Sequence, residues 1–351
     1  MKTVIADKIS SVALHHGLTR ELRVSAEIPC EEGVMVAAEI LNNKSSYNTL
    51  ELVSGRMAHL KRGDIIVGAL GHRKALFGYS GHLPTNLKPG DTVQVLNIGG
   101  VLGICDAVNA TFGAPFEARV LGAVLEFPYL GERIGVPARV GTEQLQDDAP
   151  LETRGVPIVA IAGTSMDAGK TAAASAIIAR LRHRGLTVDG FKATGVALRR
   201  DILAMEDAGA RHTSIFTDFG VVTTTRSNAA AVTRTMINKL CAGQPDVVVF
   251  ELGDGILGTY GVDAILQDTD IAAALSCLIL CANDPVGATG GVQLLANEFG
   301  LSCDLVTGPA TDNKVGRDVV TERVGLRAIN AITDGADLGD AVAEVLQERG
   351  S

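Results

Sequence analysis

The chain has 351 residues, of which 46% are hydrophobic and 20% charged, and its formal net charge is −9. This length suits two domains, and the acidic balance argues against a nucleic-acid partner, which would need a basic face. No apolar stretch has the length of a membrane span, and no secretory apolar core follows the N-terminus, so we expect a cytoplasmic protein with no membrane partner. The six cysteines form no C-x-x-C pair, which favours reduced thiols.

Residues 1–125 are predicted to form a β-rich, barrel-like domain. β-Branched or alternating runs at 23–28, 34–41, 65–70 and 92–98 are separated by turn residues. A weak internal repeat supports the barrel, because LKRGDIIV (60–67) and LKPGDTVQV (87–95) each place a Gly-Asp turn before a strand.

A glycine-rich stretch at 68–82 of this domain carries His72, Arg73 and Lys74, followed by Tyr79 and His82. The basic residues are compatible with a cationic pocket for a carboxylate or phosphate. They are also compatible with a hairpin whose basic side chains are solvated. The sequence leaves both interpretations open.

The second half of the chain has a different pattern. Residues 126–154 are polar and contain prolines, which predicts a linker or connecting strand. Residues 155–351 alternate apolar strands with helices; the strands are expected at 156–162, 188–192, 247–251, 275–282 and 303–307, and helices at 171–184, 264–273 and 337–349. This alternation predicts an α/β fold, a parallel sheet with helices on both faces and its ligands at the carboxyl ends of the strands.

The most informative motif is VPIVAIAGTSMDAGKT at 156–171, in which a strand, a glycine loop and an Ala-rich helix follow one another. Such a P-loop binds phosphate through backbone N–H groups and a helix N-terminus. Lys170 is expected to reach the β- and γ-phosphates, and the Thr171 hydroxyl to hold Mg²⁺. The predicted nucleotide-binding residues of the loop are Gly163, Thr164, Asp167, Ala168, Gly169, Lys170 and Thr171.

Five residues, rather than the usual four, separate Gly163 from Gly169. This longer loop resembles that of the dethiobiotin synthetase-like P-loop enzymes. The resemblance covers residues 155–335 and extends to GFKATG (190–195) and FELGDG (250–255). It implies a P-loop NTPase domain that uses ATP and Mg²⁺. We also expect a homodimer.

The resemblance also implies roles for residues that follow the predicted strands. It implies that Lys192 contacts the substrate and the transferring phosphoryl group, with Thr194 beside it. Arg199 and Arg200 occupy places where the family binds substrate, and Asn313 a place where it recognises the base. Ordinary alternatives remain for these residues: a lysine that closes a strand, exposed arginines at a helix start, and an Asx turn.

Acidic residues near the loop are candidate Mg²⁺ ligands. Glu251 ends an apolar run, where an ionised carboxylate is costly unless a metal or a base pairs with it, so we expect it to hold metal. The resemblance places a second metal ligand at Asp201, although Asp207 fits the approximate spacing as well. Asp218 is a further candidate in the stretch 217–225.

Together these features predict an ATP- and Mg²⁺-dependent ligase or synthetase for a small anionic metabolite. It would convert a carboxylate or carbamate into an acyl phosphate for amide or ring formation. The alternatives are a small-molecule kinase, with Asp201 or Asp218 as base, and a nucleotide-dependent switch or metallocentre-assembly ATPase that acts on a protein partner. Thr164, Ser165 or Met166 stands where such ATPases carry an extra lysine. The choice between ATP and GTP stays open.

Overall fold

The computed structural model describes residues 1–128 and 134–350, which divide into two compact units. The N-terminal unit comprises Met1–Gln144, Val196–Arg200 and Phe216–Thr223; the C-terminal unit comprises Leu145–Gly195, Asp201–Ile215 and the chain from Thr224 onward. Two segments of the predicted C-terminal domain therefore belong to the N-terminal unit. Residues 129–133 of the predicted linker lie outside the described residues. No helix within the described ranges is long and apolar enough to cross a membrane.

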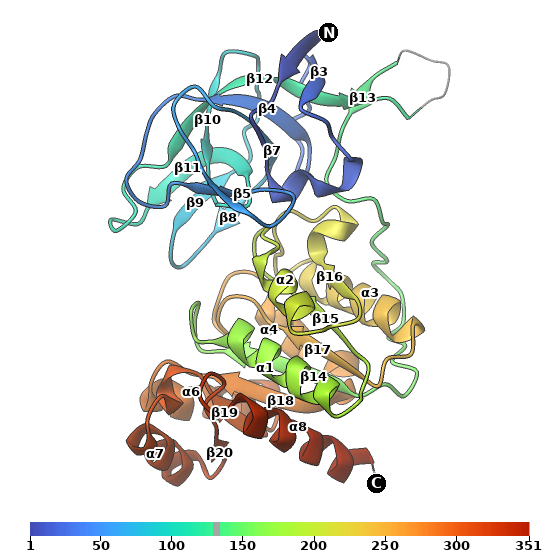
Figure 1. The fold of residues 1–351 in the computed structure, drawn as a ribbon, viewed down its shortest axis with the longest axis vertical. Helices are drawn as coiled ribbons and strands as arrows, with labels where there is room; N and C mark the ends of the chain where they lie inside the picture. Colours follow the sequence, from blue (N-terminus) through green and yellow to red (C-terminus); the bar gives the residue numbers. More distant parts are fainter. Residues whose placement is uncertain (129–133, 351) are drawn as a thin grey trace. The chain divides into compact units, whose positions relative to one another are not determined.

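The N-terminal unit consists mainly of short strands (Figure 1). They are β1 (Lys2–Ile5), β2 (Lys8–Ile9), β3 (Glu21–Ser25), β4 (Met35–Ile40), β5 (Thr49–Glu51), β6 (Met57–His59), β7 (Ile65–Leu70), β8 (Arg73–Lys74), β9 (Tyr79–His82), β10 (Thr92–Val95), β11 (Val101–Val108), β12 (Phe116–Glu126) and β13 (Val136–Pro137), with the 3-10 helices η1 (Ser11–His16) and η2 (Phe216–Phe219).

Five of these strands close into a barrel, as predicted. β10 pairs with both β11 and β12, and β7 and β4 complete the ring between them. Closure leaves these strands without a free edge on the ring. Alternate side chains, among them Val36, Ile66, Val93 and Phe116, fill the interior with a continuous apolar cluster.

The sequence repeat corresponds to two equivalent turns that precede β7 and β10. Gly63 and Gly90 have φ values of +91° and +101°, which glycine adopts at no steric cost. The carboxylates of Asp64 and Asp91 each accept a hydrogen bond from the backbone N–H three residues earlier, at 2.6 and 2.8 Å. The Gly-Asp pair therefore fixes the point where each barrel strand begins.

The C-terminal unit is a seven-stranded sheet of order β16-β15-β17-β14-β18-β19-β20. Every pairing in it is parallel, as predicted. Its elements are β14 (Ile158–Gly163), α1 (Lys170–His183), β15 (Val188–Lys192), α2 (Arg200–Asp207), β16 (Thr213–Ile215), α3 (Ala229–Ala242), β17 (Val247–Glu251), α4 (Val262–Gln267), α5 (Thr269–Ala274), β18 (Leu275–Cys281), α6 (Pro285–Phe299), β19 (Leu305–Thr307), η3 (Pro309–Thr311), α7 (Lys314–Val324), β20 (Arg327–Ala328) and α8 (Gly335–Gly350).

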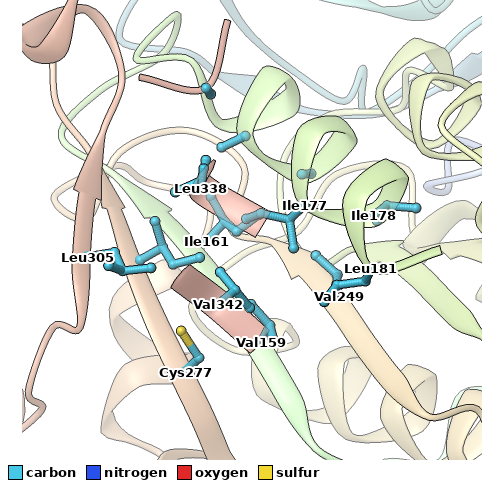
Figure 2. Close-up of a cluster of buried hydrophobic side chains, with 14 of the residues drawn as sticks. Val159, Ile161, Ile177, Ile178, Leu181, Val249, Cys277, Leu305, Leu338 and Val342 are labelled. Atoms are coloured by element: carbon cyan, nitrogen blue, oxygen red, sulfur yellow. The ribbon is translucent and has the colours of Figure 1, made fainter. Parts of the chain in front are cut away.

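Helices cover both faces of this sheet. Successive residues of a strand point to opposite faces, so they contact different helices. Leu305 packs into the cluster that α1 and α8 form over one face (Figure 2). Its neighbour Val306 packs with Ala288 and Val320, from α6 and α7, on the other face. Both faces of the sheet are buried, which explains why its strands are continuous apolar runs in the sequence.

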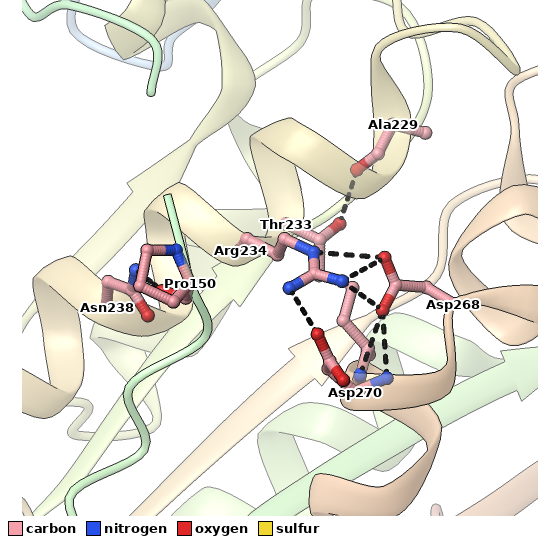
Figure 3. Close-up of polar contacts among 8 residues, drawn as sticks. Pro150, Ala229, Thr233, Arg234, Asn238, Asp268 and Asp270 are labelled. Carbon is pink, nitrogen blue, oxygen red and sulfur yellow. Dashed lines mark hydrogen bonds and ion pairs between the residues drawn. The ribbon is translucent and has the colours of Figure 1, made fainter. Parts of the chain in front are cut away.

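The prediction of one continuous helix at 264–273 is wrong. The structure divides it into α4 and α5 at Asp268, whose carboxylate caps α5 by accepting from the N–H groups of Asp270 and Ile271. The same carboxylate pairs with Arg234 of α3 through Nε and Nη2 at 3.0 and 2.7 Å (Figure 3). Capping and the ion pair together outweigh helix continuation at this residue.

The connecting segment before β14 lies along α3. The Asn238 amide donates to the Pro150 carbonyl at 2.8 Å (Figure 3). The N–H of Glu152 donates to the Asn238 side-chain oxygen at 2.7 Å. These bonds assign residues 145–152 to the C-terminal unit.

Candidate functional site

The glycine loop connects β14, which ends at Gly163, to α1, which begins at Lys170. Asp167 and Gly169 have φ values of +57° and +91°, so the chain turns sharply into the helix. The Lys170 side chain is buried and folds back over the loop, where its Nζ donates to the Ser165 carbonyl at 2.8 Å. A Cβ on Gly163 would lie 2.9 Å from Lys170 Nζ. Glycine at position 163 therefore makes room for the lysine.

The register of the sheet brings two further charged residues to the same edge. Glu251, the last residue of β17, lies opposite Lys192, the last residue of β15, and opposite Ile161 of β14. Both charged side chains are buried. Parallel strands end together, so residues far apart in the sequence meet beside the loop.

Two carboxylates converge on one hydroxyl in this site. Thr171 Oγ1 lies 3.0 Å from Glu251 Oε2 and 3.3 Å from Asp201 Oδ1. A threonine hydroxyl has a single proton, so it can donate to only one of the two at a time. Asp201 also forms a buried ion pair with Lys192. The structure thus brings together Lys170, Thr171, Lys192, Asp201 and Glu251.

The charges of these residues perturb one another. Burial, and after it the charge of Asp201, raises the pKa of the Glu251 carboxyl. The ammonium groups of Lys192 and Lys170 and the hydrogen bond from Thr171 oppose the change without cancelling it. The ionised form of Glu251 is therefore under-stabilised by the protein alone, and added positive charge would favour it.

The donor set fits a magnesium ion. Two carboxylates and a hydroxyl are hard oxygen ligands, and Mg²⁺ prefers few protein ligands and completes its shell with water and phosphate oxygens. A cation beside Glu251 and Asp201 would also offset the burial that raises the Glu251 pKa. Thr171, Glu251 and Asp201 are the residues that would hold it.

Two later strand ends also lie against the loop. A Cβ on Gly169 would lie 3.4 Å from the Cα of Gly308, and Asn283 donates to the Ser165 hydroxyl at 2.6 Å. Asn313, predicted to recognise the base, caps α7 by accepting from the Gly316 N–H. Ser165 was not among the predicted site residues, since nothing in the sequence shows that its carbonyl accepts from Lys170.

The remaining predicted site residues have other contacts or are exposed. Arg199 belongs to the N-terminal unit, where its backbone N–H donates to Glu51 at 2.8 Å and its guanidinium to the Val53 carbonyl at 3.1 Å. Arg200 is exposed at the start of α2, and Asp207 is exposed at its end. Asp218 lies in η2 of the N-terminal unit, and Thr194 donates to the Gly253 carbonyl at 2.9 Å.

The glycine-rich stretch of the barrel forms the predicted hairpin, but Arg73 is not solvated as the hairpin interpretation expected. β8 and β9 are an antiparallel pair. Arg73 is buried and donates to the Tyr47 hydroxyl and to the Leu96 carbonyl. His82 and Asp106 form an exposed pair at 2.7 Å. Arg73 therefore stabilises the hairpin, and we assign no ligand to the cluster.

A parallel sheet with helices on both faces, and a glycine loop that leads from a strand into a helix, define the fold of a P-loop NTPase. The C-terminal unit has this fold, preceded by the β-barrel. No protein-family model matches the chain. No curated protein matches it in sequence either.

Several solved structures are similar to part of the chain. The signal recognition particle receptor FtsY from Elizabethkingia anophelis is 13% identical over 55% of this chain and 67% of its own, with a TM-score of 0.38. A DUF1611 family protein from Anabaena variabilis is 15% identical over 57% and 63%, with a TM-score of 0.39. The signal recognition particle 54 kDa protein from Aeropyrum pernix K1, in complex with GDP, is 20% identical over 60% and 50%, with a TM-score of 0.36. Likenesses this weak carry no functional argument, and the resemblance to dethiobiotin synthetases stays a prediction.

Proposed function

We propose that this protein is an ATP- and Mg²⁺-dependent enzyme that phosphorylates the carboxylate or carbamate of a small anionic metabolite. An amine would then attack the acyl phosphate to form an amide, a lactam or a ring. The proposal keeps the resemblance to dethiobiotin synthetase-like enzymes that the loop, Lys192 and Glu251 suggest.

The observation that carries the proposal is the position of Lys192. Its ammonium is buried at the end of β15, beside Glu251 and paired with Asp201. A buried ammonium so close to a phosphate loop is suited to stabilise negative charge on a transferring phosphoryl group. Lys170 would bind the same group from the loop, so that the protein supplies two positive charges.

The residues would act mainly by positioning and electrostatics. Backbone N–H groups of the loop and of the first turn of α1 would hold the phosphates, and Lys170 would exchange the Ser165 carbonyl for phosphate oxygens. Mg²⁺, held by Thr171, Glu251 and Asp201, would neutralise charge on the β- and γ-phosphates. Lys192 would orient the substrate carboxylate toward the γ-phosphorus. A carboxylate is already ionised, so this first step needs no base.

A nucleotide-dependent switch is the second candidate, and one observation favours it. The connections that follow β15 and β16 contribute residues 196–200 and 216–223 to the N-terminal unit. There Glu32 accepts from the backbone N–H groups of Val222 and Thr223, at 3.0 Å each. Segments that follow nucleotide-site strands would then report nucleotide state to a second unit.

Nucleotide turnover in the presence of metabolites distinguishes these functions. Purified protein is incubated with Mg²⁺, ATP or GTP, and fractionated cytosolic metabolites, and nucleoside diphosphate release is measured with Lys170→Ala as the control. Stimulation by an acidic fraction, with a condensed product in the mass spectrum, supports the ligase. A stable phosphorylated product supports a kinase. Slow hydrolysis that responds only to a co-purifying protein supports the switch and refutes the ligase.

A further inference from the structure

The segment 196–200 joins two charged residues of the phosphate site along the chain. Lys192 lies shortly before this segment, and Asp201 follows it directly. Because Lys192 and Asp201 form a buried ion pair, the chain between them is a loop whose ends meet in the site. The contacts that hold the middle of this loop therefore help to decide where Asp201 lies.

The N-terminal unit holds the segment at Arg199. The backbone N–H of Arg199 donates to Glu51 Oε2 at 2.8 Å, and its guanidinium donates to the Val53 carbonyl at 3.1 Å. Glu51 is the last residue of β5 and is 0% exposed. A hydrogen bond from which water is excluded is electrostatically strong. Glu51 thus fixes the backbone two residues before Asp201.

The same unit holds the segment a second time, at Ala197. The Asn97 side-chain amide donates to the Ala197 carbonyl at 2.7 Å, and the Ala197 N–H donates to the Val222 carbonyl at 2.8 Å. A Cβ on Gly99 would lie 1.9 Å from the Ala197 carbonyl oxygen. Gly99 has no positive φ that would require glycine. Space for this carbonyl, rather than backbone conformation, accounts for glycine at position 99.

The ion pair with Lys192 does not by itself fix Asp201 beside the P-loop. The ammonium of Lys192 stands on a flexible four-carbon stem, so it can follow a displaced carboxylate. The 3.3 Å separation between Asp201 Oδ1 and Thr171 Oγ1 has no such tolerance, because both side chains are short. Mg²⁺ demands nearly ideal octahedral geometry from its ligands. A small shift at the start of α2 would therefore weaken a metal site while the ion pair persisted.

We propose that Glu51 is a positioning residue of the nucleotide site, which fixes Asp201 as a metal ligand by holding the segment that leads into α2. Asn97 and Gly99 hold the same segment at its Ala197 carbonyl. This inference rests on the Mg²⁺ site of the proposed function and not on the reaction that follows nucleotide binding. It applies equally to a ligase and to a switch.

The gain in nucleotide affinity that Mg²⁺ provides is the quantity that tests this role. Calorimetric titration with ATP measures it as the ratio of the affinity in Mg²⁺ to the affinity in EDTA. Glu51→Met removes the acceptor oxygen but keeps a buried side chain of similar length, and Glu51→Gln retains an oxygen that can accept from Arg199. We expect Glu51→Met to lower the gain roughly tenfold, as is typical of residues that orient metal ligands. Its affinity in EDTA should be unchanged, and Glu51→Gln should retain the wild-type gain.

A second variant reaches the same segment without altering Glu51. The methyl group added in Gly99→Ala would displace the Ala197 carbonyl, so this variant should also lower the gain from Mg²⁺. Asp91→Ala is the matched control, because Asp91 also accepts from a backbone N–H of the barrel, that of Lys88, at 2.8 Å. It should lower the midpoint of urea unfolding and retain the wild-type gain. If Glu51→Met does not fold, Gly99→Ala decides between the same outcomes.

The outcomes separate this inference from the proposed function. Wild type that binds ATP no more tightly in Mg²⁺ than in EDTA would overturn the metal site and this inference with it. A wild-type gain in Glu51→Met, or equal losses in Glu51→Met and Glu51→Gln, would overturn the role of Glu51 and leave the proposed function standing. A loss in Asp91→Ala as large as that in Glu51→Met would do the same, since the effect would then be general to the barrel.

Discussion

Replacement of Gly163 by alanine should impair nucleotide binding without unfolding the protein. Gly163 has no positive φ, so alanine can adopt its backbone conformation without strain. The added methyl group would lie 2.9 Å from Lys170 Cδ and Nζ and 3.1 Å from Cγ. These atoms belong to the flexible end of a side chain, which can move at little cost in folding free energy. The ammonium would then leave its place over the loop.

The expected magnitude follows from the contact that is lost. A hydrogen bond to a charged group contributes about 1.5–3 kcal/mol. At about 1.4 kcal/mol for each factor of ten, Gly163→Ala should weaken Mg²⁺-nucleotide binding roughly tenfold to a hundredfold. Calorimetric titration with ATP and with GTP measures the affinity, and urea unfolding measures the stability.

A matched control is available in α6. Gly290 has no heavy atom within 4 Å of an added Cβ and no positive φ, so Gly290→Ala should retain wild-type affinity. The reasoning fails if Gly163→Ala binds nucleotide as tightly as wild type. It fails equally if the variant loses affinity only in proportion to a loss of folded protein, since the effect would then be global.

Three further predictions concern stability. The folded-state pKa of Glu251 is raised above its ordinary value of 4.5, so ionisation of this carboxyl opposes folding. In EDTA, the free energy of unfolding of Glu251→Gln relative to that of wild type should therefore increase as pH rises above 4.5. Denaturant unfolding measures both pH profiles, and parallel profiles would contradict the prediction. Lys192→Met leaves Asp201 buried without its ammonium and should cost about 3–5 kcal/mol by urea unfolding, so a cost below about 1 kcal/mol would show that water reaches the pair. A Cβ on Gly339 would lie 2.3 Å from the Arg180 Cβ, so Gly339→Val should overpack α8 against α1 and cost about 1–3 kcal/mol; an unchanged thermal midpoint would refute this packing.

The sheet was predictable because its strands carry their own signal. Val188–Lys192 and Val247–Glu251 begin and end where predicted, since both faces are buried and the apolar run ends where the chain reaches the ligand edge. The helix at 264–273 was not predictable in its continuity. Asp268 is needed both as a cap and as the partner of Arg234, and that partner is distant in sequence.

Some residues of the candidate site could be predicted from a local sequence motif, whereas others depend on contacts between residues distant in the sequence. Lys170 and Thr171 follow from a contiguous motif, and Glu251 follows from a charge at the end of an apolar strand. The pairing of Lys192 with Asp201 depends on how the segment between β15 and α2 folds back. The bond between Arg199 and Glu51 spans 148 residues, and no local pattern in the sequence indicates it.

The charged groups of the site hold one another in place before any ligand arrives. Lys170 donates to the Ser165 carbonyl, Lys192 pairs with Asp201, and the Thr171 hydroxyl lies within hydrogen-bonding distance of Glu251. A buried charge without a partner is costly, so the pairing of Lys192 with Asp201 stabilises the folded state. Nucleotide and metal must therefore exchange existing partners for new ones. The net gain on binding is the difference between two sets of contacts, which makes affinity sensitive to small displacements such as that of Lys170 by a methyl group at position 163.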